Sequence, residues 1–216
     1  MSTLAFYGVL AALYVLAAGR FDLPAFWCYL AVVVGSSLAI IPVLARRSPG
    51  LLEERMRPGP GERDRISIPA MVGGLVASWL VAALDTGRFR GSGGLPFAVQ
   101  GAAWIGVVAG YAIVAWAMLV NRFFSSAVRH QADRAQTVVT AGPYAWVRHP
   151  GYTGGLLFLL ATPVALGSWW AVLPIVPVVL AVVRRTGLED AMLQRELEGY
   201  AGYARRVRFR LVPGVW

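Results

Sequence analysis

The sequence predicts an all-α fold, a polytopic transmembrane helical bundle with about five to six membrane segments that include a C-terminal helical hairpin. Three observations predict it. The 216 residues are 57% hydrophobic and only 14% charged, whereas a soluble domain carries roughly 25% charged residues. The apolar residues form long runs, and the arginines gather between those runs. Such a chain cannot surround one core with a water-compatible surface, so lipid must cover part of it.

Four apolar runs are candidates for membrane helices. They cover residues 4–18, 26–44, 66–84 and 97–120. A crossing takes roughly 20 residues, so the first run is a little short and the fourth is long enough to tilt. We predict a four-helix transmembrane region over residues 1–120. Its loop 45–65 mixes a short amphipathic piece with Pro-Gly turns and is expected at the membrane interface.

A fifth apolar block, residues 152–183, is too long for one crossing and is interrupted by Pro163, Gly167, Pro174 and Pro177. We predict a helical hairpin that turns near residues 167–170. Each arm of about 15 residues would be roughly 22 Å long at 1.5 Å per residue. Because the hydrocarbon core is about 30 Å thick, we expect this hairpin to tilt, to thin the bilayer or to be re-entrant.

The distribution of arginine tests this topology. All twenty basic residues are Arg, and seventeen lie in loop 45–65, in segment 121–151 or in the tail from residue 184. Basic residues concentrate on the cytoplasmic side of a membrane. Six crossings with both termini in the cytoplasm place all seventeen on that side, which favours the hairpin. The Ala- and Arg-rich, lysine-free composition suggests a GC-rich genome, so we expect a multi-pass protein of a bacterial inner membrane.

Composition also excludes several kinds of chemistry. Without lysine there is no Schiff base and no P-loop. Cys28 is the only cysteine, and His130 and His149 are the only histidines, so we expect neither an internal disulfide nor a metal site. The loop arginines explain the net charge of +9 without nucleic acid as a partner. Polar groups concentrate in residues 121–216, which we predict to be a cofactor-binding and catalytic region containing the hairpin 152–183.

The densest group of functional residues is 142–155. Pro150 keeps His149 out of the helical conformation and suits a first helical turn, so His149 should stand just before the first hairpin arm. The N-terminus of that arm favours an anion such as a carboxylate. The glycines alone are explained by close helix packing. His149, Arg148 and Tyr144 at one helix start favour a functional interpretation.

A second group, residues 184–190, is placed directly after the second hairpin arm. If the hairpin closes, Glu189 and Asp190 lie near the segment that precedes the first arm. A carboxylate close to the membrane is costly unless it is paired or used. A capping or snorkelling cluster is the competing interpretation, above all for Arg184 and Asp190.

A third group lies in the tail. Tyr200 and Tyr203 are three residues apart and share a helix face. Most of the tail arginines are interpreted as an amphipathic helix resting on anionic lipid.

Together these groups resemble the isoprenylcysteine carboxyl methyltransferase family of integral membrane methyltransferases. The resemblance rests on Val138-Val139-Thr140-x-Gly142-Pro143-Tyr144, on Arg148-His149-Pro150-x-Tyr152-x-Gly154, on Arg185-x-x-x-Glu189-Asp190-x-x-Leu193, and on Tyr200-x-x-Tyr203 with Val207. It covers roughly the last hundred residues. The first half is similar in hydropathy alone.

The resemblance implies S-adenosylmethionine as cofactor and S-adenosylhomocysteine as product. It implies that Glu189 contacts the cofactor and that Arg185 faces the methyl acceptor, which makes these two the expected catalytic residues. The other expected cofactor-binding residues are Gln131, Gln136, Val138, Val139, Tyr144, His149, Pro150, Gly151, Tyr152 and Gly154. Gln136, Val138, Val139 and Tyr144 resemble the part that holds the adenosine, and residues 149–152 resemble the turn that holds the methionine end. Gln131 resembles a family Gln, although the spacing differs, and Gly154 belongs to the quoted motif.

The acceptor follows from the chemistry. Methyl transfer needs alignment and exclusion of water. A carboxylate acceptor needs only orientation, which a bidentate Arg supplies, whereas an amine acceptor needs a base. We therefore expect a lipophilic acceptor, preferably a prenylcysteine-like or other lipid carboxylate, with membrane lipids as further partners. A phospholipid amine stays open, and the sequence does not indicate an oligomeric state.

Two other classes remain as alternatives. Membrane sterol reductases contain a similar Arg-His-Pro-x-Tyr-x-Gly element and bind NADPH, but they are usually longer and have tails rich in Cys and Trp. This tail contains no Cys, and Trp216 is its only Trp. The second alternative is a membrane scaffold without catalytic activity.

Overall fold

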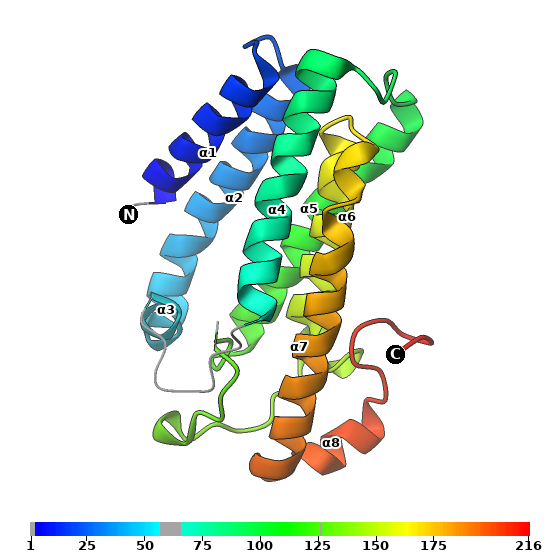
Figure 1. Ribbon diagram of the computed structural model, residues 1–216. Coiled ribbons are helices and arrows are strands. Elements are labelled where there is room, and N and C mark those ends of the chain that lie inside the picture. The colour runs from blue at the N-terminus through cyan, green and yellow to red at the C-terminus, as the bar shows by residue number, and fades with distance from the viewer. Residues whose placement is uncertain (1–2, 57–65, 126) are drawn as a thin grey trace.

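The computed structural model describes residues 3–56, 66–125 and 127–216, and within them it contains helices and no strand (Figure 1). This confirms the all-α prediction. The long helices are α1 (Thr3–Ala18), α2 (Pro24–Arg47), α4 (Ser67–Leu84), α5 (Phe97–Val120), α6 (Pro150–Ala165) and α7 (Ile175–Glu196). Helices α1, α4 and α6 run in one direction through the bundle, and α2, α5 and α7 run in the other (Figure 1).

Most of these helices suit a membrane. Helix α2, helix α4 with the π-helical turn Asp85–Phe89, helix α5, and helix α7 with the 3-10 turn Trp170–Val172 are long and apolar enough to cross one, and α1 is a shorter apolar helix. Large apolar side chains such as Leu16, Ile105 and Leu180 point outward. These features fit a multi-pass integral membrane protein, because lipid rather than water can cover such a surface.

Shorter elements lie at one end of the bundle. They are α3 (Pro49–Met56), α8 (Tyr200–Arg206) and the segment between α5 and α6, which contains the 3-10 turns Ala132–Arg134 and Gly142–Ala145 (Figure 1). The predicted interfacial loop 45–65 begins inside α2 and includes α3. Its residues 57–65 lie outside the part of the chain that the structure describes.

The predicted hairpin is formed by α6 and α7, and its turn lies where expected. Gly167 has a φ of +91°, a conformation that glycine adopts without steric cost, and the hydroxyl of Ser168 donates to Asp85 Oδ2 at 2.5 Å. The predicted end of the second arm near residue 183 is wrong, because α7 continues to Glu196. Residues 184–190 are therefore part of the helix. The loss of hydropathy after Val183 marks a change of environment and not a helix end.

Close packing joins the hairpin to the rest of the bundle. A Cβ atom on Gly154 would lie 2.6 Å from the carbonyl oxygen of Gly110, and a Cβ atom on Gly110 would lie 2.7 Å from that of Gly154. Small residues at both positions let the backbones of α5 and α6 approach. Further along the bundle, Tyr14 stacks on Phe26 at 3.9 Å between ring centroids.

The segments on either side of the hairpin meet at one end, as the closed hairpin predicts. The backbone N–H groups of Arg148 and His149 donate to the carbonyls of Phe209 and Arg210, each at 2.9 Å. The tail therefore folds back over the start of α6. The tail is therefore not one helix: α8 ends at Arg206, and the residues that follow pair with the start of α6. Arg205, Arg206 and Arg208 are exposed, and their contact with anionic lipid stays a prediction.

Candidate active site

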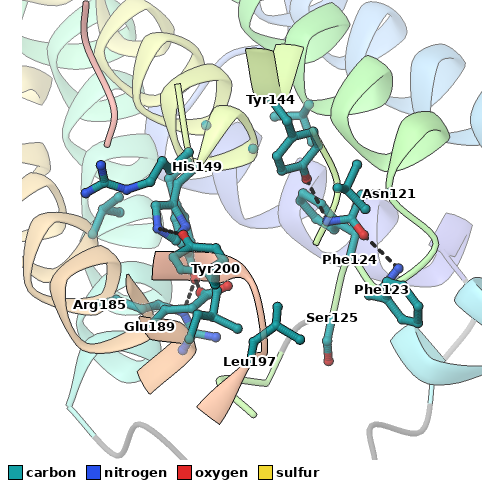
Figure 2. Close-up of a pocket in the computed structure, with 18 of the residues that line it drawn as sticks. Asn121, Phe123, Phe124, Ser125, Tyr144, His149, Arg185, Glu189, Leu197 and Tyr200 are labelled. Carbon is teal, nitrogen blue, oxygen red and sulfur yellow. Dashed lines mark hydrogen bonds between the residues drawn. The ribbon is translucent and has the colours of Figure 1, made fainter. Parts of the chain in front are cut away.

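A cavity of about 440 Å³ lies between α4, α5, α6 and α7 and reaches α8 and the segment 121–139. Its volume is typical of small-molecule sites, which range over roughly 300–1,000 Å³. Figure 2 shows two groups of side chains on opposite sides of it. His149, Arg185, Glu189 and Tyr200 form one group, and Asn121, Phe123, Phe124, Ser125 and Tyr144 form the other.

The cavity has an apolar part and a polar part. The apolar part is lined by Ile68, Met71 and Val72 of α4, by Leu156 and Leu159 of α6 and by Val182 of α7. Ile68 and Val72 have exposed fractions of 43% and 59%, so this part adjoins the outer surface of the bundle. Along α7 the lining changes from Val182 to Arg185 and then Glu189. The cavity thus joins a polar region at the bundle end to the outward-facing surface of α4.

A completely buried carboxylate, Asp190, organises the polar end. Arg148 donates to it from Nε at 2.7 Å and from Nη2 at 3.0 Å, and Arg210 donates from Nε at 3.0 Å. The hydroxyl of Tyr200 donates to the same carboxylate at 3.1 Å. A buried charge requires such partners. Asp190 is therefore neither a cap nor a snorkelling residue, which corrects the competing interpretation from sequence.

His149 is positioned from two sides. The backbone N–H groups of Tyr152 and Thr153 donate to its carbonyl at 3.0 and 3.1 Å, so His149 directly precedes α6, as the following proline predicts. Its ring Nε2 lies 3.2 Å from Asp190 Oδ1 and 3.4 Å from the Tyr200 hydroxyl. The imidazole is therefore held beside the first turn of α6, where the positive end of the helix dipole favours an anion.

Tyr152 connects the two expected catalytic residues. Its hydroxyl donates to Glu189 Oε2 at 2.6 Å and accepts a hydrogen bond from Arg185 Nε at 2.7 Å. Arg185 and Glu189 are four residues apart on α7 and so share a helix face. All three side chains line the cavity, and the guanidinium of Arg185 is almost completely buried.

The opposite wall contains the residues expected to hold an adenosine. Gln136, Val138, Val139 and Tyr144 all line the cavity. The phenol of Tyr144 accepts a hydrogen bond from Asn121 Nδ2 at 3.0 Å. Burial raises the pKa of the Tyr144 phenol well above its usual value, so this side chain is neutral and offers a hydrogen bond without a charge.

Three expected site residues do not line the cavity. Gln131 is buried and donates from Nε2 to the carbonyl of Phe123 at 2.6 Å, so it supports the loop from behind. Pro150 occupies the first turn of α6, and Gly154 packs against α5. The motif predicts these three residues at the site, and in the structure each lies beside the cavity lining and not in it. Gly151 and Tyr152, by contrast, do line the cavity.

Other cavity residues lack a recognisable sequence signal. They are Asn121, Phe123, Phe124, Ser125 and Leu197. A Cβ atom on Gly151 would lie 2.4 Å from the Phe124 ring, so the glycine admits that aromatic side chain. The one sequence feature that could have indicated a cavity residue is the position of Asn121, a polar residue directly after an apolar run.

The described residues form a helical bundle that fits a multi-pass membrane protein, with a cavity of small-molecule size at one end. Residues 98–198, a little under half of the chain, match the family model described as phospholipid methyltransferase. That family belongs to the clan of isoprenylcysteine carboxyl methyltransferase-like integral membrane methyltransferases, which confirms the resemblance. The match supports a membrane methyltransferase and implies S-adenosylmethionine as methyl donor. No curated protein matches the chain.

Proposed function

We propose that this protein transfers a methyl group from S-adenosylmethionine to a lipophilic acceptor. The observation that carries the proposal is the continuity of one cavity from a polar end, which contains Glu189, to an apolar end, with Arg185 where the two meet. A charged cofactor suits the polar end, and a lipid chain suits the apolar end beside α4. A single cavity can therefore bring the two reactants into contact.

The residues at the polar end fit the cofactor. Its carboxylate suits His149 and the positive end of the α6 helix dipole. Its ammonium group or ribose diol suits the carboxylate of Glu189, which Tyr152 orients at 2.6 Å. Its adenine suits a wall of Val138, Val139 and Leu197. Aromatic and apolar walls with a few oriented polar groups are typical of such sites.

The cofactor supplies an electrophilic methyl group on a positively charged sulfur. As a bond forms between the acceptor atom and the methyl carbon, the carbon–sulfur bond breaks and its electron pair remains on sulfur. The residues of this chain align the acceptor with that bond and exclude water. The apolar side chains of α4 and α6 serve the second purpose.

Arg185 favours a carboxylate as the acceptor. Its Nε is fixed by Tyr152, so the guanidinium plane has a defined orientation in the cavity. A planar guanidinium recognises a carboxylate through two parallel hydrogen bonds. A carboxylate is already nucleophilic, so this arrangement needs no base. A prenylcysteine-like or other lipid acid combines the required carboxylate with an apolar chain.

The match to phospholipid methyltransferases supports a second candidate, N-methylation of a phospholipid amine. An ammonium acceptor must lose a proton before it can attack. Glu189 is the cavity carboxylate closest along α7 to Arg185, and a carboxylate can accept such a proton. The two candidates differ in the bond formed, an ester in one case and an amine in the other.

A methyl-transfer assay tests the proposal. Purified protein in lipid vesicles is supplied with S-adenosylmethionine carrying a radiolabelled methyl group and with a prenylcysteine analogue, a fatty acid or phosphatidylethanolamine. Mild base releases the label from an ester and leaves it on an amine, which separates the two candidates. Thermal stabilisation by S-adenosylhomocysteine and not by NADPH is expected. Stabilisation by NADPH alone would overturn the proposal and favour a reductase.

A further inference from the structure

The segment that forms one wall of the cavity has little regular structure of its own. Between the end of α5 and the 3-10 turn Gly142–Ala145, the described residues form one further 3-10 turn, Ala132–Arg134. Yet Phe123, Phe124 and Ser125 line the cavity directly. A segment without backbone ladders depends on side-chain interactions for its conformation. The conformation of this wall segment therefore depends on the side chains that it contacts.

A buried ion pair joins this segment to α3. Arg129 donates from Nε to Glu54 Oε1 at 3.1 Å and from Nη2 to Glu54 Oε2 at 2.8 Å. Only 5% of the Arg129 side chain and 6% of the Glu54 side chain are exposed. The exposed pair Arg20–Asp22, with 30% and 72% exposed, shows what a surface pair in this protein looks like. The Glu54 pair is therefore a structural contact and not a solvated one.

The same carboxylate reaches the cavity wall. Ser125 donates from its hydroxyl to Glu54 Oε1 at 2.7 Å, and that hydroxyl accepts a hydrogen bond from the backbone N–H of Ala127 at 3.1 Å. Glu54 thus binds the wall at two points, Ser125 and Arg129. Asp133 adds to the cluster by accepting a hydrogen bond from Arg129 Nη1 at 2.8 Å.

Helix α3 is itself anchored to the bundle. Leu51 is buried in a cluster with Leu44 of α2 and Met118 of α5, and Phe124 packs against that cluster. Leu51 and Glu54 are three residues apart and so lie on neighbouring positions of one face. The apolar contact fixes α3 to the bundle, and the ion pair fixes the wall to α3.

We propose that Glu54 and Arg129 are positioning residues that hold the wall residues Phe123, Phe124 and Ser125 in the arrangement that binds the cofactor. This inference rests on the proposed function, because it concerns affinity for the same cofactor. Neither residue lines the cavity, so both act through Ser125 and the neighbouring phenylalanines. Loss of Glu54 leaves the buried Arg129 with the exposed Asp133 as its counterion in place of a buried carboxylate, and loss of Arg129 leaves Glu54 buried without that counterion, which is unfavourable.

The test compares Glu54→Ala with Glu53→Ala, a matched truncation at the adjacent, exposed position of the same helix. The first measurement is hydrogen exchange of backbone amides in residues 121–139 of the full-length protein without any ligand. Faster exchange in Glu54→Ala but not in Glu53→Ala is expected. Unchanged exchange in a folded Glu54→Ala protein would overturn the inference, whatever the cofactor turns out to be.

The second measurement is binding and kinetics. In Glu54→Ala the Kd for S-adenosylhomocysteine and the KM for S-adenosylmethionine should rise roughly tenfold or more, with kcat within about threefold of the parent. Glu54→Gln keeps an acceptor for both partners and should restore most of the affinity. A fall in kcat with an unchanged KM would contradict a positioning role.

These two measurements separate the failure of the inference from failure of the proposed function. If the parent protein binds no S-adenosylhomocysteine, the proposed function falls, while the exchange experiment still decides whether Glu54 holds the wall. If Glu54→Ala does not fold, Arg129→Lys replaces it, since Lys keeps the charge but cannot make both contacts that Arg129 Nε and Nη2 make with Glu54. Exchange and affinity equal to the parent in folded Arg129→Lys would overturn the inference.

Discussion

The side chains of Arg148 and Asp190, 42 residues apart in sequence, are joined by two hydrogen bonds of 2.7 and 3.0 Å. Arg148 precedes α6, and Asp190 lies in the last part of α7. Arg148 also donates from Nη1 to the carbonyls of Val207 and Arg208 at 2.9 and 2.8 Å. One guanidinium therefore connects the start of the hairpin, its second arm and the tail.

We expect Asp190→Ala to reduce the free energy of unfolding by about 3–5 kcal/mol, because removing one partner leaves Arg148 buried without its counterion. Chemical denaturation of the detergent-solubilised protein measures this change. Asp22→Ala, at an exposed pair, is the control and should have little effect, as is usual for surface ion pairs. Equal effects of the two substitutions would show that the Asp190 cluster contributes no special stability.

Arg185→Gln should lower kcat/KM for methyl transfer by roughly 100-fold, because a misoriented acceptor loses the alignment that transfer requires. Its affinity for S-adenosylhomocysteine should stay close to that of the parent. The adjacent Arg184 does not line the cavity, so Arg184→Gln is the matched control and should remain active. Full activity in Arg185→Gln would remove this residue from the reaction.

Gly154→Ala should destabilise the protein by about 1–3 kcal/mol, because overpacking forces α5 and α6 apart. The added Cβ would lie 2.6 Å from the Gly110 carbonyl oxygen. At the neighbouring Gly155 the added Cβ would meet nothing within 4 Å. Gly155→Ala should therefore be neutral or raise stability by roughly 0.5–1 kcal/mol. Thermal unfolding of both variants distinguishes a packing role from a general effect of helix propensity.

The buried tyrosines of α8 predict a loss of stability at alkaline pH. Burial raises the pKa of the Tyr200 and Tyr203 phenols well above the ordinary value of 10.0, and Asp190 adds to the effect at Tyr200. The folded state therefore keeps protons that the unfolded chain releases, and stability falls as the pH rises above about 10.

Unfolding free energies measured between about pH 8 and pH 11 test this expectation. Tyr200→Phe removes one of the shifted groups, so its stability should decline less steeply with pH than that of the parent. Parallel curves for the two proteins would contradict the burial effect at Tyr200. Tyrosinate absorbance of the folded protein provides an independent check, since Tyr200 and Tyr203 should ionise late.

Several features of the fold could be predicted because they depend on neighbouring residues. Apolar runs set the positions of the long helices, and Pro150 and Gly167 set the start and the turn of the hairpin. The end of α7 could not be predicted in this way. Hydropathy falls after Val183, but no proline or glycine turn interrupts the backbone until Gly199, so the helix continues to Glu196.

The candidate site could be predicted in part. Glu189, Arg185, Tyr152 and His149 were expected together, and all four line one cavity. Gln131 belongs to the same motif region but faces away from the cavity, because its amide is used by the carbonyl of Phe123. A motif indicates which residues are near a site, whereas the direction of each side chain depends on its packing.

The sequence by itself determined the helical class, the closed hairpin and the motif residues, since hydropathy, proline and glycine act over a few residues. Tertiary structure alone decided which charges are buried together. Glu54 and Arg129 are 75 residues apart, and Asp190 and Arg148 are 42 apart. No local pattern records such pairs. They form because a charge removed from water is stable only beside a partner that the fold delivers to it.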